Sequence, residues 1–174
     1  MKTTLVYLVG FMGAGKTCVG RRLAELLNWT FLDLDSEIEK RERVSIREIF
    51  KLQGEPRFRE IETEELERAS RMTEAVVALG GGAFCSDGNQ EIVRRTGLSV
   101  WLSAPVERLY ARCIGNAVRP LLTTREEMEA LLRHRIPFYR KADYQLDVAD
   151  RPAAAAAEAI FRMLSRTVIR RQSR

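Results

Sequence analysis

Five short apolar runs alternate along the chain with longer stretches whose apolar residues recur at helical spacing. Most of these runs are rich in β-branched or aromatic residues, as expected of strands that are buried on both faces. The runs are 5–9, 31–35, 75–79, 98–102 and 144–148. Strands that alternate with helices predict a parallel sheet covered by helices on both faces. With 174 residues, the chain has the length of one domain, so we expect a single α/β domain.

Sequence signals mark the ends of several helical stretches. Ser45 with Glu48, and Thr124 with Glu127, have the spacing of capping boxes, so helices are expected to begin there. Gly54-Glu55-Pro56 should break the first of these helices and restart it, with Pro56 in the first turn of the new segment. Further helices are predicted around 19–27, over 105–112 and over 152–164, and the tail after 166 is expected to fray.

The strongest functional signal lies between the first strand and the helix that follows it. Residues 10–17 read Gly-Phe-Met-Gly-Ala-Gly-Lys-Thr, which fits the phosphate-loop pattern. A glycine loop in this position aims backbone N–H groups and a helix N-terminus at one phosphate. Lys16 adds a positive charge for the β- and γ-phosphates, and the Thr17 hydroxyl can ligate the accompanying magnesium ion. The loop therefore predicts a nucleoside triphosphate with Mg²⁺.

Two carboxylates lie within the second run, 31–35, toward its carboxyl end. If the strand continues through Asp35, a period of two places Asp33 and Asp35 on one face at its carboxyl end. Ligands bind at that end of the strands in open α/β sheets. The alternative is a turn or a helix cap at Asp35-Ser36.

The third apolar run ends directly in Gly80-Gly81-Gly82. Three consecutive glycines are costly in conformational entropy. They are expected where a backbone must approach a ligand with no Cβ atoms in the way, and the carboxyl end of a strand suits that use. A loose turn is the alternative.

Two arginines lie beside the apolar stripes of helices. Glu62, three residues after Arg59, can hold the guanidinium of Arg59, and spacing alone favours an ordinary surface ion pair over a role in ligand binding. Arg135 lies four residues after Leu131, where an unpaired guanidinium would be costly. We expect Arg135 to have a carboxylate partner, from the protein or from a substrate. Pro137 should end or kink this helix.

Composition narrows the possible classes of protein. The longest apolar run, 5–9, is too short to cross a membrane, and no signal-peptide pattern is present. Cys18, Cys85 and Cys113 lack metal-ligand spacing, so a reduced cytosolic compartment is the simplest interpretation. His134 is the only histidine, which argues against histidine triads and histidine metal clusters, and we expect it to face solvent.

The net charge of +5 suits an enzyme whose ligands are polyanions. Basic and acidic residues are mixed along most of the chain. Only the tail, 166–174, is a basic run, and it keeps a nucleic-acid partner as the alternative. No membrane partner is expected.

Taken in order, these motifs resemble the shikimate kinases over nearly the whole chain. Very many nucleotide-binding enzymes share the phosphate loop, but the ordered set of motifs is highly specific. The matching pieces are 10–17, Asp33-Leu34-Asp35, Gly54-Glu55 followed by Phe58-Arg59 and Glu62, Gly80-Gly81-Gly82, Arg119-Pro120-Leu121, and Arg135 with Pro137 and Tyr139.

The resemblance implies a fold and an activity. The fold is a three-layer α/β sandwich with a five-stranded parallel sheet, as in P-loop nucleoside monophosphate kinases. A lid is expected at about 115–124 and a substrate-binding segment at about 36–62. The implied activity is ATP-dependent phosphorylation of the 3-hydroxyl of shikimate, a step of chorismate and aromatic amino-acid biosynthesis. A cytoplasmic monomer is expected.

For shikimate, the resemblance implies a binding role for Asp35, Arg59, Gly81 and Arg135. The aspartate holds ring hydroxyls, the two arginines clasp the carboxylate, and Gly80 and Gly82 complete a glycine wall around Gly81. Asp35 is also expected to be catalytic: it would orient the attacking hydroxyl first and accept its proton second, and Glu62 would orient Arg59.

For ATP, the resemblance makes Lys16 and the lid arginine Arg119 catalytic, and Asp33 orients the water shell of the magnesium ion on Thr17. The implied nucleotide contacts are Gly13, Ala14, Gly15, Lys16, Thr17, Cys18, Arg119 and Arg151. Arg151 is our choice for the adenine contact and Asp150 its competitor, because the segment 147–152 is one residue shorter than the family pattern.

Rival functions come from two classes. A kinase of similar architecture could act on gluconate or a nucleoside monophosphate, since paired arginines and acids could hold either. A nucleotide switch of the GTPase type would need a guanine-reading Asn-Lys-x-Asp motif, which the sequence lacks. A nucleic-acid motor would normally be a larger protein.

Overall fold

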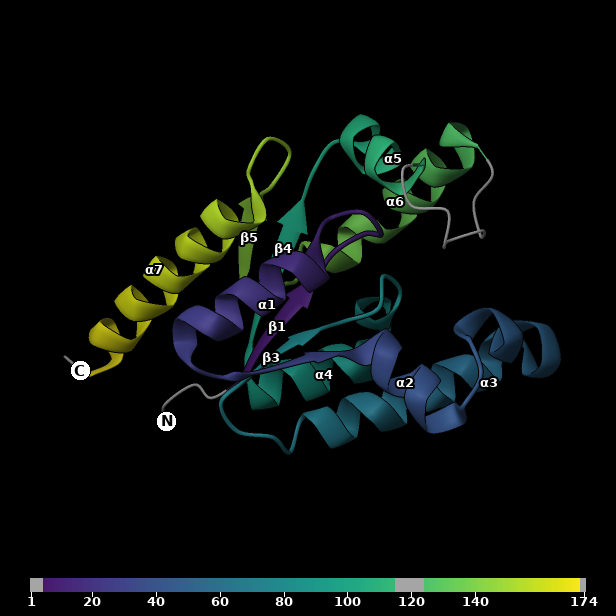
Figure 1. Ribbon diagram of the computed structural model, residues 1–174, viewed down its shortest axis with the longest axis horizontal. Coiled ribbons are helices and arrows are strands. Elements are labelled where there is room, and N and C mark those ends of the chain that lie inside the picture. Colours follow the sequence, from purple (N-terminus) through teal and green to yellow (C-terminus); the bar gives the residue numbers. More distant parts are fainter. Residues whose placement is uncertain (1–4, 115–123, 173–174) are drawn as a thin grey trace.

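The computed structural model describes residues 5–114 and 124–172, with side chains described as far as 165 (Figure 1). Its centre is a five-stranded sheet in the order β2-β3-β1-β4-β5, in which every pair of neighbours is parallel. The strands are β1 (Leu5–Val9), β2 (Thr30–Asp33), β3 (Ala75–Ala78), β4 (Leu98–Ser103) and β5 (Tyr144–Asp147). All five predicted strands are confirmed.

Helices cover both faces of the sheet and make the predicted three layers. α1 and α7 pack against each other on one face, whereas α4 packs against β4 and against α3 on the other (Figure 1). The helices are α1 (Lys16–Leu27), α2 (Leu34–Glu42), α3 (Ile46–Ala69), α4 (Asp87–Thr96), α5 (Val106–Ile114), α6 (Arg125–Tyr139) and α7 (Ala153–Gln172). None of these helices, as far as the structure describes them, could span a membrane.

The sheet register brings the predicted motifs together at the carboxyl ends of neighbouring strands. Asp33 pairs with Ala78 of β3, and Ala78 pairs with Leu8 of β1, so these strands end side by side. The phosphate loop, Asp33 and the glycine triplet therefore leave the sheet at neighbouring points. This is the edge at which ligands bind in open α/β sheets.

The second strand is shorter than predicted. β2 ends at Asp33, whose carboxylate accepts a hydrogen bond from the Ser36 N–H at 3.4 Å and caps α2. Asp35 lies in the first turn of that helix, where a negative charge is favourable. The prediction that a strand period aligns Asp33 with Asp35 is thus wrong, because capping at Asp33 ends the strand two residues early.

Helix ends follow their local signals more closely. Both predicted capping boxes form, at Ser45 and at Thr124. Gly54 breaks α3 as predicted, with φ 80° and ψ 168°, backbone angles that only glycine adopts readily. Pro137 lies inside α6, which continues two residues further to Tyr139, so it does not end the helix there, and whether it kinks the helix stays a prediction. α7 continues past 164 to Gln172, and whether its tail frays stays a prediction.

Two hydrophobic clusters organise the interior. The larger joins the strands to the helices on both faces and contains β1 completely. The smaller consists of Ile38, Ile49, Phe58 and Ile61, and it holds α2 against the two halves of α3. The pair α2–α3 thus has a core of its own beside the sheet, and the rings of Phe50 and Phe58 pack against each other there, with centroids 4.6 Å apart and a tilt of 37°. The helices α2 and α4 were not predicted.

Candidate active site

The phosphate loop has the local structure that its sequence predicts. Gly15 adopts left-handed angles (φ 87°, ψ 19°) and α1 begins at the next residue, so the helix N-terminus opens toward the loop. The Lys16 ammonium is buried and donates to the carbonyl oxygens of Gly10 and Phe11 at 2.8 and 3.0 Å. The Thr17 hydroxyl donates to the Asp33 carboxylate at 2.6 Å. The Thr17 hydroxyl and the Asp33 carboxylate therefore lie together at the start of the helix that Lys16 begins.

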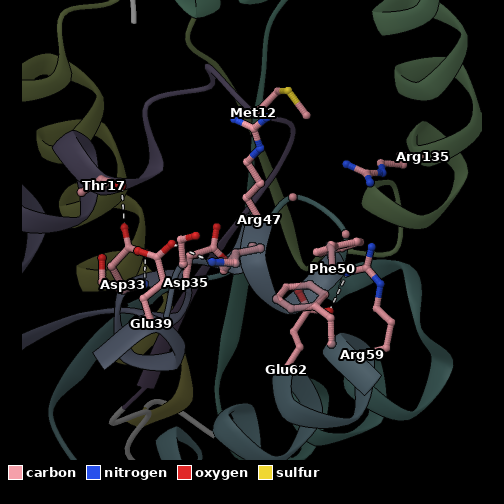
Figure 2. A pocket seen from close by; sticks show the side chains of 17 residues that line it. Met12, Thr17, Asp33, Asp35, Glu39, Arg47, Phe50, Arg59, Glu62 and Arg135 are labelled. Atoms are coloured by element: carbon pink, nitrogen blue, oxygen red, sulfur yellow. Dashed lines mark hydrogen bonds and ion pairs between the residues drawn. The ribbon is translucent and has the colours of Figure 1, made fainter. Parts of the chain in front are cut away.

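A cavity of about 560 Å³ opens beside this loop (Figure 2). Figure 2 shows the carboxylates of Asp33 and Asp35 on one side of the cavity and the guanidiniums of Arg59 and Arg135 on the other. Its walls come from the phosphate loop, α2, both halves of α3, the glycine triplet and α6. The lining residues are Met12, Thr17, Asp33, Asp35, Ser36, Glu39, Ser45, Ile46, Arg47, Phe50, Phe58, Arg59, Glu62, Gly80, Gly81, Gly82 and Arg135.

The three glycines make room for charged side chains. A Cβ atom on Gly80 would lie 2.6 Å from an oxygen of Asp35, and one on Gly81 would lie 3.2 Å from a nitrogen of Arg135. A Cβ atom on Gly82 would lie 2.6 and 2.7 Å from Nη1 and Nη2 of Arg59. The sequence placed the triplet correctly at the strand end. The structure adds that each glycine accommodates a different ionic side chain of the cavity.

Arg59 is held by carboxylates on two sides. Its Nη1 donates to Glu62 at 2.8 Å, as the spacing predicted, and its Nε and Nη2 donate to one oxygen of Glu55 at 3.2 and 2.9 Å. The side chain of Glu62 is only 2% exposed, so this is not the ordinary surface ion pair that remained the alternative. Burial raises the pKa of Glu62, and the guanidinium of Arg59 opposes that rise without cancelling it.

Arg135 reaches the cavity from α6. Among the ion pairs of the described residues, none involves Arg135, although its guanidinium lies 5.5 Å from the ring centre of Phe11. One turn further on, the buried Tyr139 hydroxyl donates to the Gly81 carbonyl and so ties α6 to the glycine triplet. Within the described chain no carboxylate forms an ion pair with Arg135, although its charge is one of those that oppose the rise in the pKa of Glu62.

Comparison with known proteins places this chain in a family. The shikimate kinase family model matches residues 12–165. The chain is 47% identical to shikimate kinase of Cereibacter sphaeroides over 84% of its own length and 75% of that protein. The chain belongs to the shikimate kinase family. The family resemblance of the motifs is thereby confirmed, and so is an α/β fold of this type.

Further shikimate kinases match this chain along most of their lengths. The enzyme of Moorella thermoacetica is 43% identical over 89% of this chain and 91% of its own. The solved structure of shikimate kinase from Acinetobacter baumannii in complex with shikimate superposes with a TM-score of 0.91, at 38% identity over 95% of this chain and 94% of that one. A gluconokinase from Sinorhizobium meliloti superposes at 0.62 with 16% identity, which shows a shared fold only.

Other residues implied by the shikimate kinase resemblance lie away from the cavity or outside the described chain. Arg119 and nearly all of the lid expected at 115–124 lie outside the described residues. Asp150 forms an exposed ion pair with Arg108 at 2.6 Å, and Arg151 is exposed. Neither is among the residues that line the cavity. His134 is exposed on α6, as expected.

Arg112 is a residue that sequence reasoning missed. From α5 it donates to the carbonyl oxygens of Val148 and Ala149, both at 2.8 Å, and to that of Gly13 at 3.4 Å. It therefore connects the phosphate loop with the segment expected to contact adenine. No sequence signal marked it, because its partners are backbone atoms. Glu39 was missed likewise, and it accepts from the Ile46 N–H at the start of α3.

Proposed function

We propose that this chain transfers the γ-phosphoryl group of ATP to the 3-hydroxyl of shikimate, giving ADP and 3-phosphoshikimate. The observation that supports this best is the arrangement of one cavity, with a phosphate loop at its edge and two guanidiniums opposite. Its volume of about 560 Å³ is of the size that encloses a small ligand. Family membership gives the reaction, and the cavity supplies a physical basis for it.

The carboxylate of shikimate would bind Arg59 and Arg135. Planar guanidiniums bind carboxylates through paired N–H groups, which lysines cannot do. Arg135 forms no ion pair within the described residues and faces the cavity, so a ligand carboxylate is the partner we assign to it. Glu62 accepts a hydrogen bond from Arg59 beside the same space, and Gly82 leaves room there for its guanidinium.

Asp35 would orient the attacking hydroxyl. It lies on the side of the cavity nearest Thr17 and Asp33, and Gly80 leaves room for its carboxylate. Phosphoryl transfer passes through a loose transition state, in which positioning and charge neutralisation contribute most. We therefore assign Asp35 to orientation first and to accepting the hydroxyl proton second.

Lys16 and the helix N-terminus of α1 would hold the phosphates of ATP. The Lys16 ammonium now donates to two carbonyl oxygens of its own loop, and these bonds can be exchanged for phosphate oxygens. The hydroxyl of Thr17 and the carboxylate of Asp33, 2.6 Å apart, are the hard oxygen donors that suit Mg²⁺. A bound magnesium ion would neutralise charge on the transferring phosphoryl group. Closure of the lid with Arg119 would exclude water.

The adenine contact of Arg151 stays a prediction, with Asp150 as its competitor. The support for it is indirect: Arg112 connects the backbone at Val148 and Ala149, just before Asp150 and Arg151, with the phosphate loop. The cytoplasmic location and the monomeric state expected from the sequence also stay predictions.

An acceptor panel tests the proposal. Purified protein with ATP and Mg²⁺ would be assayed for ADP release with shikimate, gluconate and nucleoside monophosphates as separate acceptors. We expect ADP release only with shikimate. Release with gluconate or a nucleotide and not with shikimate would refute the proposal, although the relatives already disfavour that alternative.

A further inference from the structure

The break in α3 places Glu55 beside Arg59. Gly54 interrupts the helix, and the segment that restarts carries Glu55 in its first turn. Arg59 follows four residues later, which puts both side chains on the same face of the restarted helix. The site described above uses Arg59 and Glu62 but gives Glu55 no role.

The carboxylates of Glu55 and Glu62 contact different parts of the Arg59 guanidinium. Glu55 accepts from Nε and Nη2 through one oxygen, so it covers the edge that these two nitrogens share. Glu62 accepts from Nη1. The remaining edge, between Nη1 and Nη2, lies against Gly82, where an added Cβ would be nearer to both nitrogens than to the central carbon. Because each of these nitrogens carries two N–H groups, both can still donate on this side, and an edge with two N–H donors can bind a carboxylate through two hydrogen bonds.

We propose that Glu55 is a positioning residue, which fixes the rotation of the Arg59 guanidinium so that its Nη1–Nη2 edge is presented to the carboxylate of the substrate. The inference rests on the proposed function, because it concerns how the shikimate carboxylate is bound. Glu62 alone holds a single nitrogen and leaves the guanidinium free to turn about that contact. A second carboxylate on the opposite edge removes this freedom before the substrate arrives, and preorganisation of this kind lowers the cost of binding.

A purely structural role for the Glu55–Arg59 pair is a poor explanation of its geometry. The side chain of Glu55 is 62% exposed, and exposed ion pairs contribute little to stability. The same helix carries a matched pair, Arg57–Glu60, whose acid is 64% exposed and whose residues do not line the cavity. Removal of either acid should leave the fold unchanged, so the two variants separate positioning from stability.

The experiment compares Glu55→Ala, Glu55→Gln and the control Glu60→Ala with the unmodified full chain. KM and kcat are measured for shikimate and for ATP, together with the thermal midpoint. For Glu55→Ala we expect KM for shikimate to rise about tenfold, as for one lost hydrogen bond to a charged group. Its kcat at saturation, its KM for ATP and its thermal midpoint should not change. Glu55→Gln keeps an acceptor oxygen and should recover part of the loss, and Glu60→Ala should match the unmodified protein.

A substrate that lacks the carboxylate tests whether Glu55 acts through the carboxylate of shikimate. In a shikimate analogue whose carboxylate is replaced by a primary alcohol, Glu55→Ala should leave KM unchanged, because Arg59 no longer binds an anion there. An unchanged or lowered KM for shikimate in Glu55→Ala would overturn the positioning role, and so would an equal effect in Glu60→Ala. If the unmodified protein does not phosphorylate shikimate at all, the proposed function fails, and the role of Glu55 fails with it.

Discussion

Replacing Gly82 by alanine is a sharp test of the substrate site, because the three atoms nearest to the new methyl group would all belong to the guanidinium of Arg59. The added Cβ would lie 2.6 Å from Nη1 and 2.7 Å from Nη2. An ordinary contact needs about 3.5 Å, so the guanidinium must retreat by close to 1 Å. Glu62 cannot follow easily, because its side chain is 2% exposed and one of its oxygens lies near Gly80.

The expected loss follows from the hydrogen bonds that this movement breaks. A hydrogen bond to a charged group contributes about 1.5–3 kcal/mol. Loss of one such bond between Arg59 and the shikimate carboxylate corresponds to a rise in KM of about 10- to 100-fold, at 1.4 kcal/mol for each factor of ten. The fold should survive, because Gly82 has φ −101° and ψ −15°, which alanine adopts without strain, and because a flexible arginine tip relieves the clash.

The assay is steady-state kinetics with shikimate varied at saturating ATP, together with a thermal melt. KM for ATP should not change in Gly82→Ala. The control is Gly88→Ala in α4, where an added Cβ would meet only the Ser86 hydroxyl at 3.7 Å, an ordinary contact. A folded Gly82→Ala protein whose KM for shikimate equals that of the unmodified chain would refute the placement of Arg59 in the site.

Three further predictions concern other parts of the site. Arg119→Ala should reduce turnover far more than shikimate affinity, because a lid arginine acts on the transferring phosphoryl group; equal losses would argue against that role. Arg112→Ala frees the carbonyls of Val148 and Ala149, so KM for ATP should rise several-fold while KM for shikimate stays constant, and the reverse pattern would contradict the bracing role. Burial raises the pKa of Glu62 above its ordinary 4.5, so the folded state holds that proton more tightly than the unfolded chain. The contribution of Glu62 to the free energy of unfolding is therefore largest below pH 4.5, and it falls as the pH rises through the raised pKa. Urea titrations should show this fall in the unmodified protein and not in Glu62→Gln, and parallel curves for the two proteins would be the contrary result.

The sheet and the phosphate loop could be predicted from the sequence because their signals are local. A strand buried on both faces needs a short apolar run, and the loop needs glycines at fixed spacing before Lys16 and Thr17. The capping boxes at Ser45 and Thr124 are equally local, and both form. Each of these features depends on residues within a few positions of one another.

The errors lie where two local signals compete or where partners are distant in the chain. At Asp33 a strand pattern meets a good capping residue, and the cap prevails, so Asp35 reaches the cavity from a helix and not from a strand. Arg112 could not be identified because its acceptors are backbone oxygens 36 and 37 residues further on. The structure was also needed to match Gly80 with Asp35 and Gly82 with Arg59.

The central claim is that a small organic acid, held by Arg59 and Arg135, lies beside the terminal phosphoryl group of ATP. Its most direct test is phosphorus NMR of a reaction that contains the protein, ATP, Mg²⁺ and shikimate, repeated with Arg59→Ala and Arg135→Ala. We predict one shikimate phosphorylated at its 3-hydroxyl for each ADP formed, and loss of that product in both variants at limiting shikimate. Undiminished product in either variant, or ADP formed at the same rate without shikimate, would contradict the account.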